Sequence, residues 1–224
     1  MEIIAHFKSA LPEKFGLPRQ SHLAPHLMGK IVFDEKYSDP QAFEGLEGYD
    51  RIWVLWKFDV PEDEKFRAKV RPPKLGGNTY VGVFATRSPF RPNHIGLSCV
   101  KIERIDASGK QTVIEVSGAD MMDGTLIYDI KPYLPYADSY PDARGGFAQE
   151  RAENISLLKV EIPDDLLEII PEDKAEGLME ILSLDPRPSY HEDPERIYGI
   201  SYAGFNVKFT VCGDVAKVVD ISGI

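Results

Sequence analysis

The stretch "RIWVLWKF", residues Arg51–Phe58, carries the clearest information about the fold of this 224-residue chain. Its apolar side chains are consecutive from Ile52 to Trp56 and do not alternate with polar ones. A short apolar run of this kind is typical of a strand that is buried on both faces. We therefore expect Arg51–Phe58 to form a central, fully covered strand.

Short runs rich in Val, Ile, Tyr and Phe lie on both sides of this stretch. Val100 and Ile102 alternate with Lys101 and Glu103, which is the period-two pattern of a strand with one buried face. The expected strands are Glu2–Lys8, Lys30–Phe33, Arg51–Phe58, Tyr80–Phe84, Ser98–Ile105, Thr112–Ser117 and Thr125–Ile130. So many short strands in so short a segment indicate a mainly β fold, either a barrel or a sandwich.

The character of the sequence changes after a connection rich in proline and glycine, residues 132–146. Pro163 and Pro171 each lie where a helix could begin. A helical stripe follows at Ala175, Leu178, Met179 and Leu182, and strand-like runs occupy residues 196–221. We expect two domains: residues 1–142, and a small α+β domain at residues 143–224.

Composition limits the cellular setting. The chain is 43% hydrophobic, but it holds no apolar run long enough to cross a membrane. Its first residues lack the apolar segment of a signal peptide. Cys99 and Cys212 lie far apart, so we interpret them as reduced thiols, with a disulfide as the alternative. We expect a cytoplasmic protein without a membrane partner.

The net charge of −10 hides a basic segment, residues 65–94. This segment contains no acidic residue and carries +7, which leaves −17 on the remainder of the chain. A local basic region on an acidic protein suits an anionic partner and discourages non-specific binding. A solvated charged loop is the alternative interpretation.

The stretch "GVFATRSPFRPNHIGLS" (residues 82–98), which overlaps the end of the basic segment, is dense in functional side chains. Pro89 and Pro92 fix the backbone on either side of Phe90 and Arg91. Arg87 and Arg91 then present planar guanidinium groups suited to phosphate or carboxylate. The alternative is a structural turn in which the arginines pair with acidic neighbours.

Two further stretches could contribute to a site. "GADMMDGTLIYDIKPYLP" (residues 118–135) contains Asp120, Asp123 and Asp129, which could bind a cation or an amino group, or could cap turns. "KFGLPRQSH" (residues 14–22) is a proline-stiffened loop that, alone, is more typical of an ordinary surface loop than of a site. We expect no metal site, and the sequence has neither a dinucleotide-binding fingerprint nor a P-loop.

Six blocks of the sequence together resemble the TsaA-like, or TrmO, family, in the order associated with that family. The blocks are "EKFGLPRQ", "YDRIWVLWKFD", "RPPKLGGN", "GVFATRSPFRPNHIGLS", "DMMDGTLIYDIKPYLPYADS" and "DPRPSY". The resemblance implies a small closed β-barrel that differs from the Rossmann methyltransferases. It also implies S-adenosylmethionine-dependent methylation of the exocyclic nitrogen of threonylcarbamoyladenosine, next to the tRNA anticodon.

The resemblance also implies which residues bind the cofactor. These are Gln20, Ser21, His22, Phe58, Asp59, Arg87, Leu97, Asp120, Met121, Met122 and Asp123. We expect tRNA phosphates to be bound by the basic residues Lys65, Arg67, Lys69, Arg71, Lys74 and Arg91. The resemblance assigns no general base, and the candidates are Asp59, His94, Asp120 and Asp123.

Two other functions remain open from the residues alone. A non-enzymatic RNA-binding barrel would also use aromatic platforms and a basic groove. A sensor that binds S-adenosylmethionine without RNA chemistry would keep the cofactor site. We expect the anticodon loop of tRNA as the macromolecular partner, and a homodimer.

Overall fold

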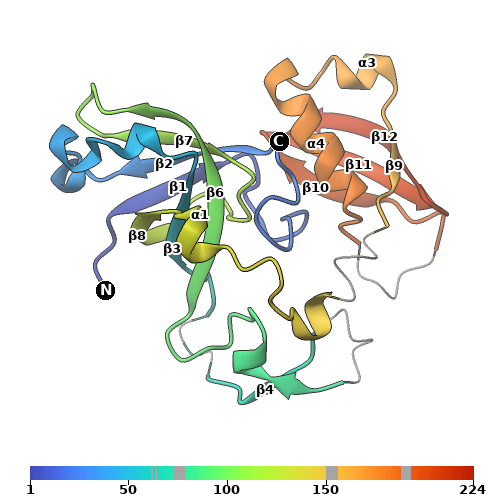
Figure 1. Ribbon diagram of the computed structural model, residues 1–224. Helices are drawn as coiled ribbons and strands as arrows, with labels where there is room; N and C mark the ends of the chain where they lie inside the picture. Colours follow the sequence, from blue (N-terminus) through green and yellow to red (C-terminus); the bar gives the residue numbers. More distant parts are fainter. Residues whose placement is uncertain (62, 64, 73–78, 150–155, 188–192) are drawn as a thin grey trace.

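The computed structural model describes residues 1–61, 63, 65–72, 79–149, 156–187 and 193–224. Its N-terminal part is a closed antiparallel barrel with the strand order β1-β2-β7-β6-β3-β8 (Figure 1). The barrel strands are β1 (Ala5–Ser9), β2 (Met28–Phe33), β3 (Arg51–Lys57), β6 (Ile95–Asp106), β7 (Val113–Ser117) and β8 (Leu126–Pro132).

Alternation along the strands fills the barrel interior. In β3, Ile52, Val54 and Trp56 point inward and are buried, and the neighbouring strands do the same with their own alternate residues. The sheet closes where β1 pairs with β8, with Ala5 opposite Ile127. The closed barrel implied by the resemblance is therefore confirmed, and the sandwich alternative is wrong.

The outer face of β3 corrects one expectation. Trp53 and Leu55 are only half-buried, so the strand is not covered on both faces. Trp53 lies against the ring of Tyr133, with centroids 5.7 Å apart, and its Nε1 donates to Asp138 at 2.9 Å. In a closed barrel the outside of each strand faces solvent, and here one short helix, α1 (Pro135–Asp138), gives partial cover.

The expected strand Tyr80–Phe84 is wrong over most of its length. Val83 is buried, its N–H donates to the carbonyl of Ala68 at 3.0 Å, and Thr86 N–H closes a turn onto the Val83 carbonyl at 3.1 Å. The first bond continues the pairing with the strand Lys69–Val70 by one residue, and the second turns the chain and ends the strand. The elements here are β4 (Lys69–Val70), β5 (Val81–Gly82), which pairs with it, and the 3-10 turn η5 (Val83–Ala85).

The segment between β2 and β3 forms a series of 3-10 turns. Asp39 accepts from the N–H of Gln41 at 3.0 Å and begins one of them, and Gly45, at φ 85°, begins another. Phe43 is buried and its ring meets that of Phe33 edge to face, with centroids 4.9 Å apart. The turns are η1 (Glu35–Tyr37), η2 (Pro40–Phe43) and η3 (Leu46–Gly48).

The C-terminal part is a small α+β unit, as expected. Its sheet has the order β10-β11-β12-β9, and α4 packs against it with Leu178, Ile181 and Leu182 buried. Pro163 and Pro171 directly precede the two helices, which confirms them as helix starts. The elements are η6 (Gly146–Ala148), β9 (Lys159–Glu161), α3 (Asp164–Leu167), α4 (Glu172–Ser183), β10 (Tyr198–Tyr202), β11 (Phe205–Cys212) and β12 (Val215–Gly223).

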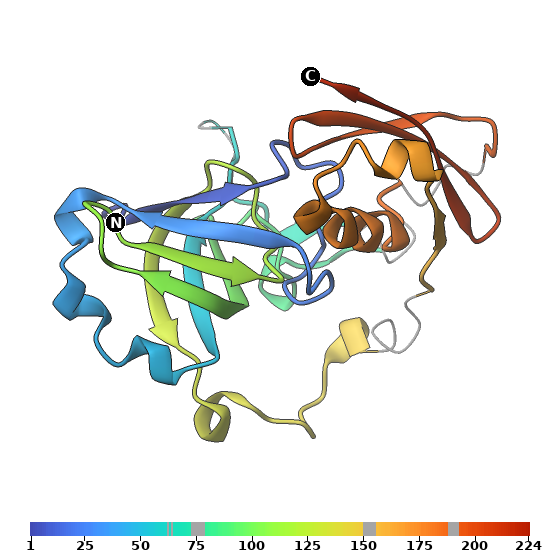
Figure 2. The same cartoon turned by 90° about the horizontal axis from the view of Figure 1, so that it is seen from above.

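The loop between β1 and β2, residues 10–27, joins the two parts of the chain (Figure 2). Leu11 and Leu27 from this loop are buried in the same apolar cluster as the C-terminal helix and sheet. Ala203 N–H donates to the carbonyl of Ala10 at 2.7 Å. A Cβ at Gly16, where φ is 93°, would lie 2.0 Å from Cδ1 of Ile200, so this approach requires glycine. The C-terminal part therefore holds the loop in place.

Cys99 and Cys212 are free in the structure, on β6 and β11 respectively. Within the described part of the chain, every helix is too short or too polar to cross a bilayer.

Candidate active site

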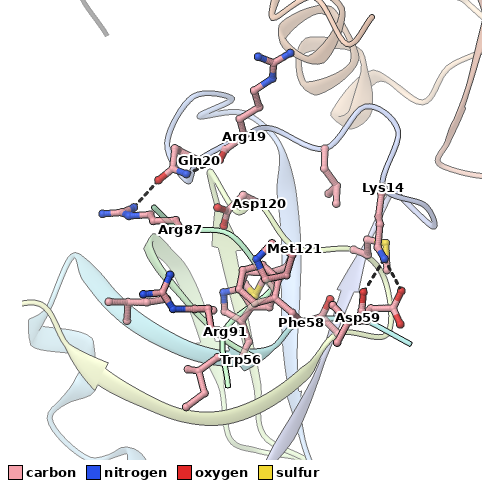
Figure 3. A pocket seen from close by; sticks show the side chains of 18 of the residues that line it. Lys14, Arg19, Gln20, Trp56, Phe58, Asp59, Arg87, Arg91, Asp120 and Met121 are labelled. Carbon is pink, nitrogen blue, oxygen red and sulfur yellow. Dashed lines mark hydrogen bonds and ion pairs between the residues drawn. The ribbon is translucent and has the colours of Figure 1, made fainter. Parts of the chain in front are cut away.

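A cavity of about 700 Å³ opens at the end of the barrel where β3 finishes and β6 begins. Its walls come from the loop after β1, the end of β3, the segment that leads into β6, and the β7–β8 connection (Figure 3). The lining residues are Lys14, Leu17, Pro18, Arg19, Gln20, Trp56, Phe58, Asp59, Val60, Pro61, Thr86, Arg87, Pro89, Phe90, Arg91, Ile95, Gly96, Leu97, Asp120, Met121, Met122 and Thr125.

Aromatic and sulfur-containing side chains form the floor of this cavity. Trp56 and Phe58 meet edge to face with ring centroids 4.4 Å apart, and Met121 lies beside them. Gly96 pairs with Trp56 across β3 and β6, and a Cβ there would lie 2.2 Å from Cε2 of the indole. Glycine at this position therefore lets the indole lie flat against the neighbouring strand.

A buried hydrogen-bond chain connects this floor to Asp120. The indole Nε1–H of Trp56 donates to Oγ of Ser98 at 2.9 Å, and the Ser98 hydroxyl donates to Oδ1 of Asp120. Ser98 is 1% exposed, so its hydroxyl has little access to competing water. The chain fixes both the indole and the carboxylate before any ligand binds.

Burial raises the pKa of the Asp120 carboxyl above its ordinary value. The Ser98 hydroxyl, backbone N–H groups of Asp120 and Ser21, and the positive charge of Arg87 oppose this effect. The burial effect is the largest, so Asp120 is a stronger proton acceptor than an exposed carboxylate. A cation beside it would favour the ionised form.

Arg87 supplies a positive charge on the same side of the cavity. Its Nη1 donates to Oε1 of Gln20, and Nε2 of Gln20 donates to the carbonyl of Arg19 at 2.6 Å (Figure 3). Gln20 therefore links the loop after β1 to the arginine segment, 67 residues away in the sequence. The guanidinium group remains exposed to the cavity, where a carboxylate could accept from its other N–H groups.

The structure brings most of the expected cofactor residues together. Gln20, Phe58, Asp59, Arg87, Leu97, Asp120, Met121 and Met122 all line the cavity. Ser21, His22 and Asp123 do not. The His22 N–H donates to the Gly118 carbonyl at 2.7 Å, while Asp123 accepts from Ser9 N–H at 3.0 Å. Ser21 is buried and reaches the site through its backbone N–H to Asp120.

The candidates for the general base have different surroundings. Asp59 is exposed, and Lys14 Nζ lies 3.1 Å from its Oδ2 at the opposite rim of the cavity from Arg87 (Figure 3). His94 does not line the cavity, and its Nδ1 lies 2.7 Å from the Pro89 carbonyl. The Asp123 carboxylate accepts from the N–H of Ser9, the last residue of β1. Asp120 is the candidate that combines access to the cavity with a raised pKa.

The basic residues expected to bind RNA lie around β4 and the mouth of the cavity. Arg91 lines the cavity, but its Nη1 donates to the carbonyls of Thr86 at 2.6 Å and Val83 at 3.3 Å. Lys65, Arg67, Lys69 and Arg71 are exposed. Lys74 lies outside the described residues.

Three residues of the site were not anticipated from the sequence: Lys14 and Trp56, which line the cavity, and Ser98, which lies behind its wall. Ser98 had a signal, because it occupies an inward position of a strand in which Gly96 and Val100 are also buried. A polar residue among inward apolar ones needs a buried partner. Lys14 and Trp56 had no comparable signal. Among the described residues, no group of three or more His, Cys, Asp or Glu side chains is placed to hold a metal ion.

Comparison with known proteins identifies the family. The model of the tRNA-methyltransferase O N-terminal domain matches residues 6–139, and that of the TrmO C-terminal domain matches residues 151–224. A protein of Escherichia coli described as tRNA (adenine(37)-N6)-methyltransferase is 37% identical over 216 residues, which cover 94% of this chain and 92% of that protein.

A protein of Pseudomonas aeruginosa described as a putative S-adenosylmethionine-dependent methyltransferase, RcsF, is 38% identical over 98% of this chain and 96% of its own length. The crystal structure of TrmO from Pseudomonas aeruginosa superposes with a TM-score of 0.79 at 31% identity, covering 99% of this chain and 97% of that one. Sequence, fold and length agree over both parts of the molecule: the chain belongs to the tRNA-methyltransferase O (TrmO) family.

Proposed function

We propose that this protein transfers the methyl group of S-adenosylmethionine to the exocyclic nitrogen of adenosine 37 in tRNA, when that base carries a threonylcarbamoyl group. The observation that carries the proposal is the cavity in which Arg87, Asp120 and the aromatic floor face a common space. Membership of the TrmO family, with relatives described as tRNA (adenine(37)-N6)-methyltransferases, supports the reaction class.

The residues of the cavity fit the chemical groups of S-adenosylmethionine. Arg87, positioned by Gln20, is suited to the carboxylate of the methionine moiety. The Asp120 carboxylate is suited to its cationic groups, and the floor of Trp56 and Phe58 to its adenine. Placing a cation beside Asp120 would offset the cost of burying that carboxylate.

The size of the cavity suits a site in which two ligands meet. Its volume of about 700 Å³ lies in the upper half of the range typical of small-molecule sites. Methyl transfer is an in-line displacement, so its rate depends on holding the nitrogen and the donor methyl group in alignment. Walls contributed by segments far apart in sequence can position both partners at once.

We assign the proton transfer to Asp120. The substrate nitrogen lies between adenine and a carbamoyl carbonyl, so it is a poor nucleophile until its proton is removed. When bound, S-adenosylmethionine supplies the methyl group from a cationic sulfonium, which becomes a neutral thioether. Asp120 attracts that cation before transfer and accepts the nitrogen's proton as the positive charge disappears. Ser98 holds the carboxylate in position for both roles.

The basic residues near β4 are suited to tRNA phosphates. Lys65 and Lys69 are exposed and belong to the segment that carries +7 in a chain of net charge −10. The anticodon loop is single-stranded, so little energy is needed to turn its base into a cavity. We further propose that residues 1–142 and 143–224 are separate domains, and that the protein is a cytoplasmic homodimer.

The test uses two versions of one tRNA, with and without the threonylcarbamoyl group. Each is incubated with protein and S-adenosylmethionine, and the digested nucleosides are analysed by mass spectrometry. We expect methylation of the modified version to exceed that of the unmodified one strongly, by up to about four orders of magnitude, because a site built to pair polar groups rejects ligands that lack them. Equal methylation of both versions would refute the substrate assignment.

Binding measurements with the same protein and tRNA separate the alternative functions. Binding of tRNA without methyl transfer would indicate a non-enzymatic RNA-binding barrel. Binding of S-adenosylmethionine in calorimetry without tRNA binding would indicate a sensor. The Asp120→Asn variant is the matched control for chemistry, since it preserves shape but removes the charge and the proton acceptor.

A further inference from the structure

Exposed aromatic rings gather beside the mouth of the cavity. Phe84 is 71% exposed, Tyr80 53% and Phe66 49%. The rings of Phe66 and Phe84 lie roughly parallel, at 29°, with centroids 6.2 Å apart. Clustered exposed apolar side chains of this kind are typical of binding surfaces.

Arginine side chains accompany these rings. The guanidinium of Arg71 lies 4.4 Å from the centroid of Tyr80, and that of Arg91 lies 5.6 Å from the centroid of Phe84. Aromatic rings interleaved with guanidinium groups are the surface that single-stranded nucleic acids use, because every base offers a flat face and every linkage a negative charge.

Hydrogen bonds fix the backbone turn that carries the exposed ring of Phe84. Phe84 belongs to η5, in which Val83 is buried. The carbonyl of Val83 accepts from the Thr86 hydroxyl at 2.8 Å. Arg91 donates to the carbonyls of both Val83 and Thr86. A ring carried by a fixed turn requires little ordering of the backbone when a ligand binds.

The rings are continuous with the cavity. Thr86 and Arg91, which fix the turn that carries Phe84, also line the cavity. Phe90 is a further lining residue, and the guanidinium of Arg67 lies 4.1 Å from its centroid. A strand whose target base enters the cavity would therefore bring its neighbouring nucleotides onto this surface.

We propose that Phe84 and Phe66 form a stacking platform for the base next to the methylated adenosine in the anticodon loop. This inference rests on the proposed function and adds how the flanking RNA is held. Charge favours RNA over a second copy of the chain, because a two-fold contact through this surface would bring two segments of +7 together.

The test measures binding of a fluorescent anticodon stem-loop RNA by anisotropy. Phe84→Ala and Phe84→Leu should each weaken binding by roughly tenfold or more, the loss typical of one stacked base, and Phe84→Trp should restore it. The dependence of affinity on salt should stay unchanged in all three, because no charge is removed. Tyr136→Ala is the matched control: its ring is 88% exposed, but it belongs to α1 and not to the basic segment.

A second readout reports stacking directly. The fluorescent base 2-aminopurine, placed on either side of the target adenosine, should be quenched on binding to the wild-type protein at one of the two positions. Phe84→Leu should abolish that quenching. Unchanged RNA affinity and unchanged quenching in Phe84→Leu would overturn the proposal. So would loss of self-association in sedimentation with RNA affinity intact, which would make the surface a contact between copies.

Failure of the proposed function would look different. Calorimetry with S-adenosylmethionine should give the same affinity in wild type and Phe84→Ala, since Phe84 does not line the cavity. Suppose the wild-type protein binds neither cofactor nor modified adenosine, while Phe84→Ala still weakens RNA binding. That result would refute the proposed enzymatic function and support the stacking platform.

Discussion

Replacing Ser98 with alanine should weaken both the fold and the site, because one hydroxyl serves two buried partners. Ser98 is 1% exposed, accepts from Trp56 Nε1 at 2.9 Å and donates to Asp120. The variant leaves the shape of the strand unchanged and removes both bonds. Trp56 is 8% exposed, so its N–H has little access to water as a substitute acceptor.

The two losses differ in size. An orphaned buried donor such as the Trp56 N–H costs about 1–3 kcal/mol. Asp120 faces the cavity, where water can replace part of the hydrogen bond it loses, so its contribution is smaller than that of a fully enclosed carboxylate. The free energy of unfolding at neutral pH should therefore fall by about 2–3 kcal/mol in Ser98→Ala.

Ser117→Ala provides a matched control for urea unfolding followed by fluorescence. Ser117 is 4% exposed and its hydroxyl also donates to a carboxylate, Glu103, at 2.6 Å. It serves that partner alone, and Glu103 keeps Lys101 at 2.9 Å. This control should lose about 1 kcal/mol, with the same slope against urea as the wild type.

The pH dependence of cofactor affinity gives the second measurement. Burial raises the pKa of Asp120, and the Ser98 hydroxyl partly lowers it, so removing Ser98 should raise that pKa further. Protonated Asp120 has no charge for a cation, so affinity should fall as pH falls through this pKa. In Ser98→Ala the fall should begin at a higher pH than in the wild type. Ser117→Ala should leave the profile unchanged.

Equal stability losses in Ser98→Ala and Ser117→Ala, together with superimposable pH profiles, would refute the reasoning. The result would mean that neither Trp56 nor Asp120 depends on the shared hydroxyl.

Three other perturbations test separate parts of the structure. Arg87→Ala should weaken S-adenosylmethionine binding by roughly 1.5–3 kcal/mol in calorimetry, with Arg87→Lys recovering part of it; an unchanged dissociation constant would remove Arg87 from the site. Gly16→Ala should destabilise the protein by about 2–4 kcal/mol in denaturant unfolding, because it adds backbone strain and a clash with Ile200; a stable variant would show that the loop yields easily. Glu180 raises the pKa of His26, so its pairing should stabilise the fold below the ordinary histidine pKa and cease to do so as pH rises through the raised value. The stability difference between wild type and Glu180→Gln should accordingly shrink as pH increases, and a pH-independent difference would contradict this pairing.

Local sequence patterns predict the strands of the barrel, and the motifs predict the segments that build its site. Alternation with a period of two is a local property, so Val100 and Ile102 could be assigned to a buried face without knowing their neighbours. The helix starts at Pro163 and Pro171 were equally local, because proline fixes its own backbone. The order of motifs in the family resemblance then placed Arg87 and Asp120 in one site.

Which side chains meet depends on how distant segments pack together. Ser98 reaches Asp120, and Gln20 reaches Arg87, across sequence separations of 22 and 67 residues. Such contacts depend on strand register and barrel closure, and no local pattern encodes them. The same holds for Asp123, whose carboxylate faces the end of β1 instead of the cavity. Periodicity tells which face a residue occupies, but the environment that sets a carboxyl's pKa exists only once distant segments have packed together.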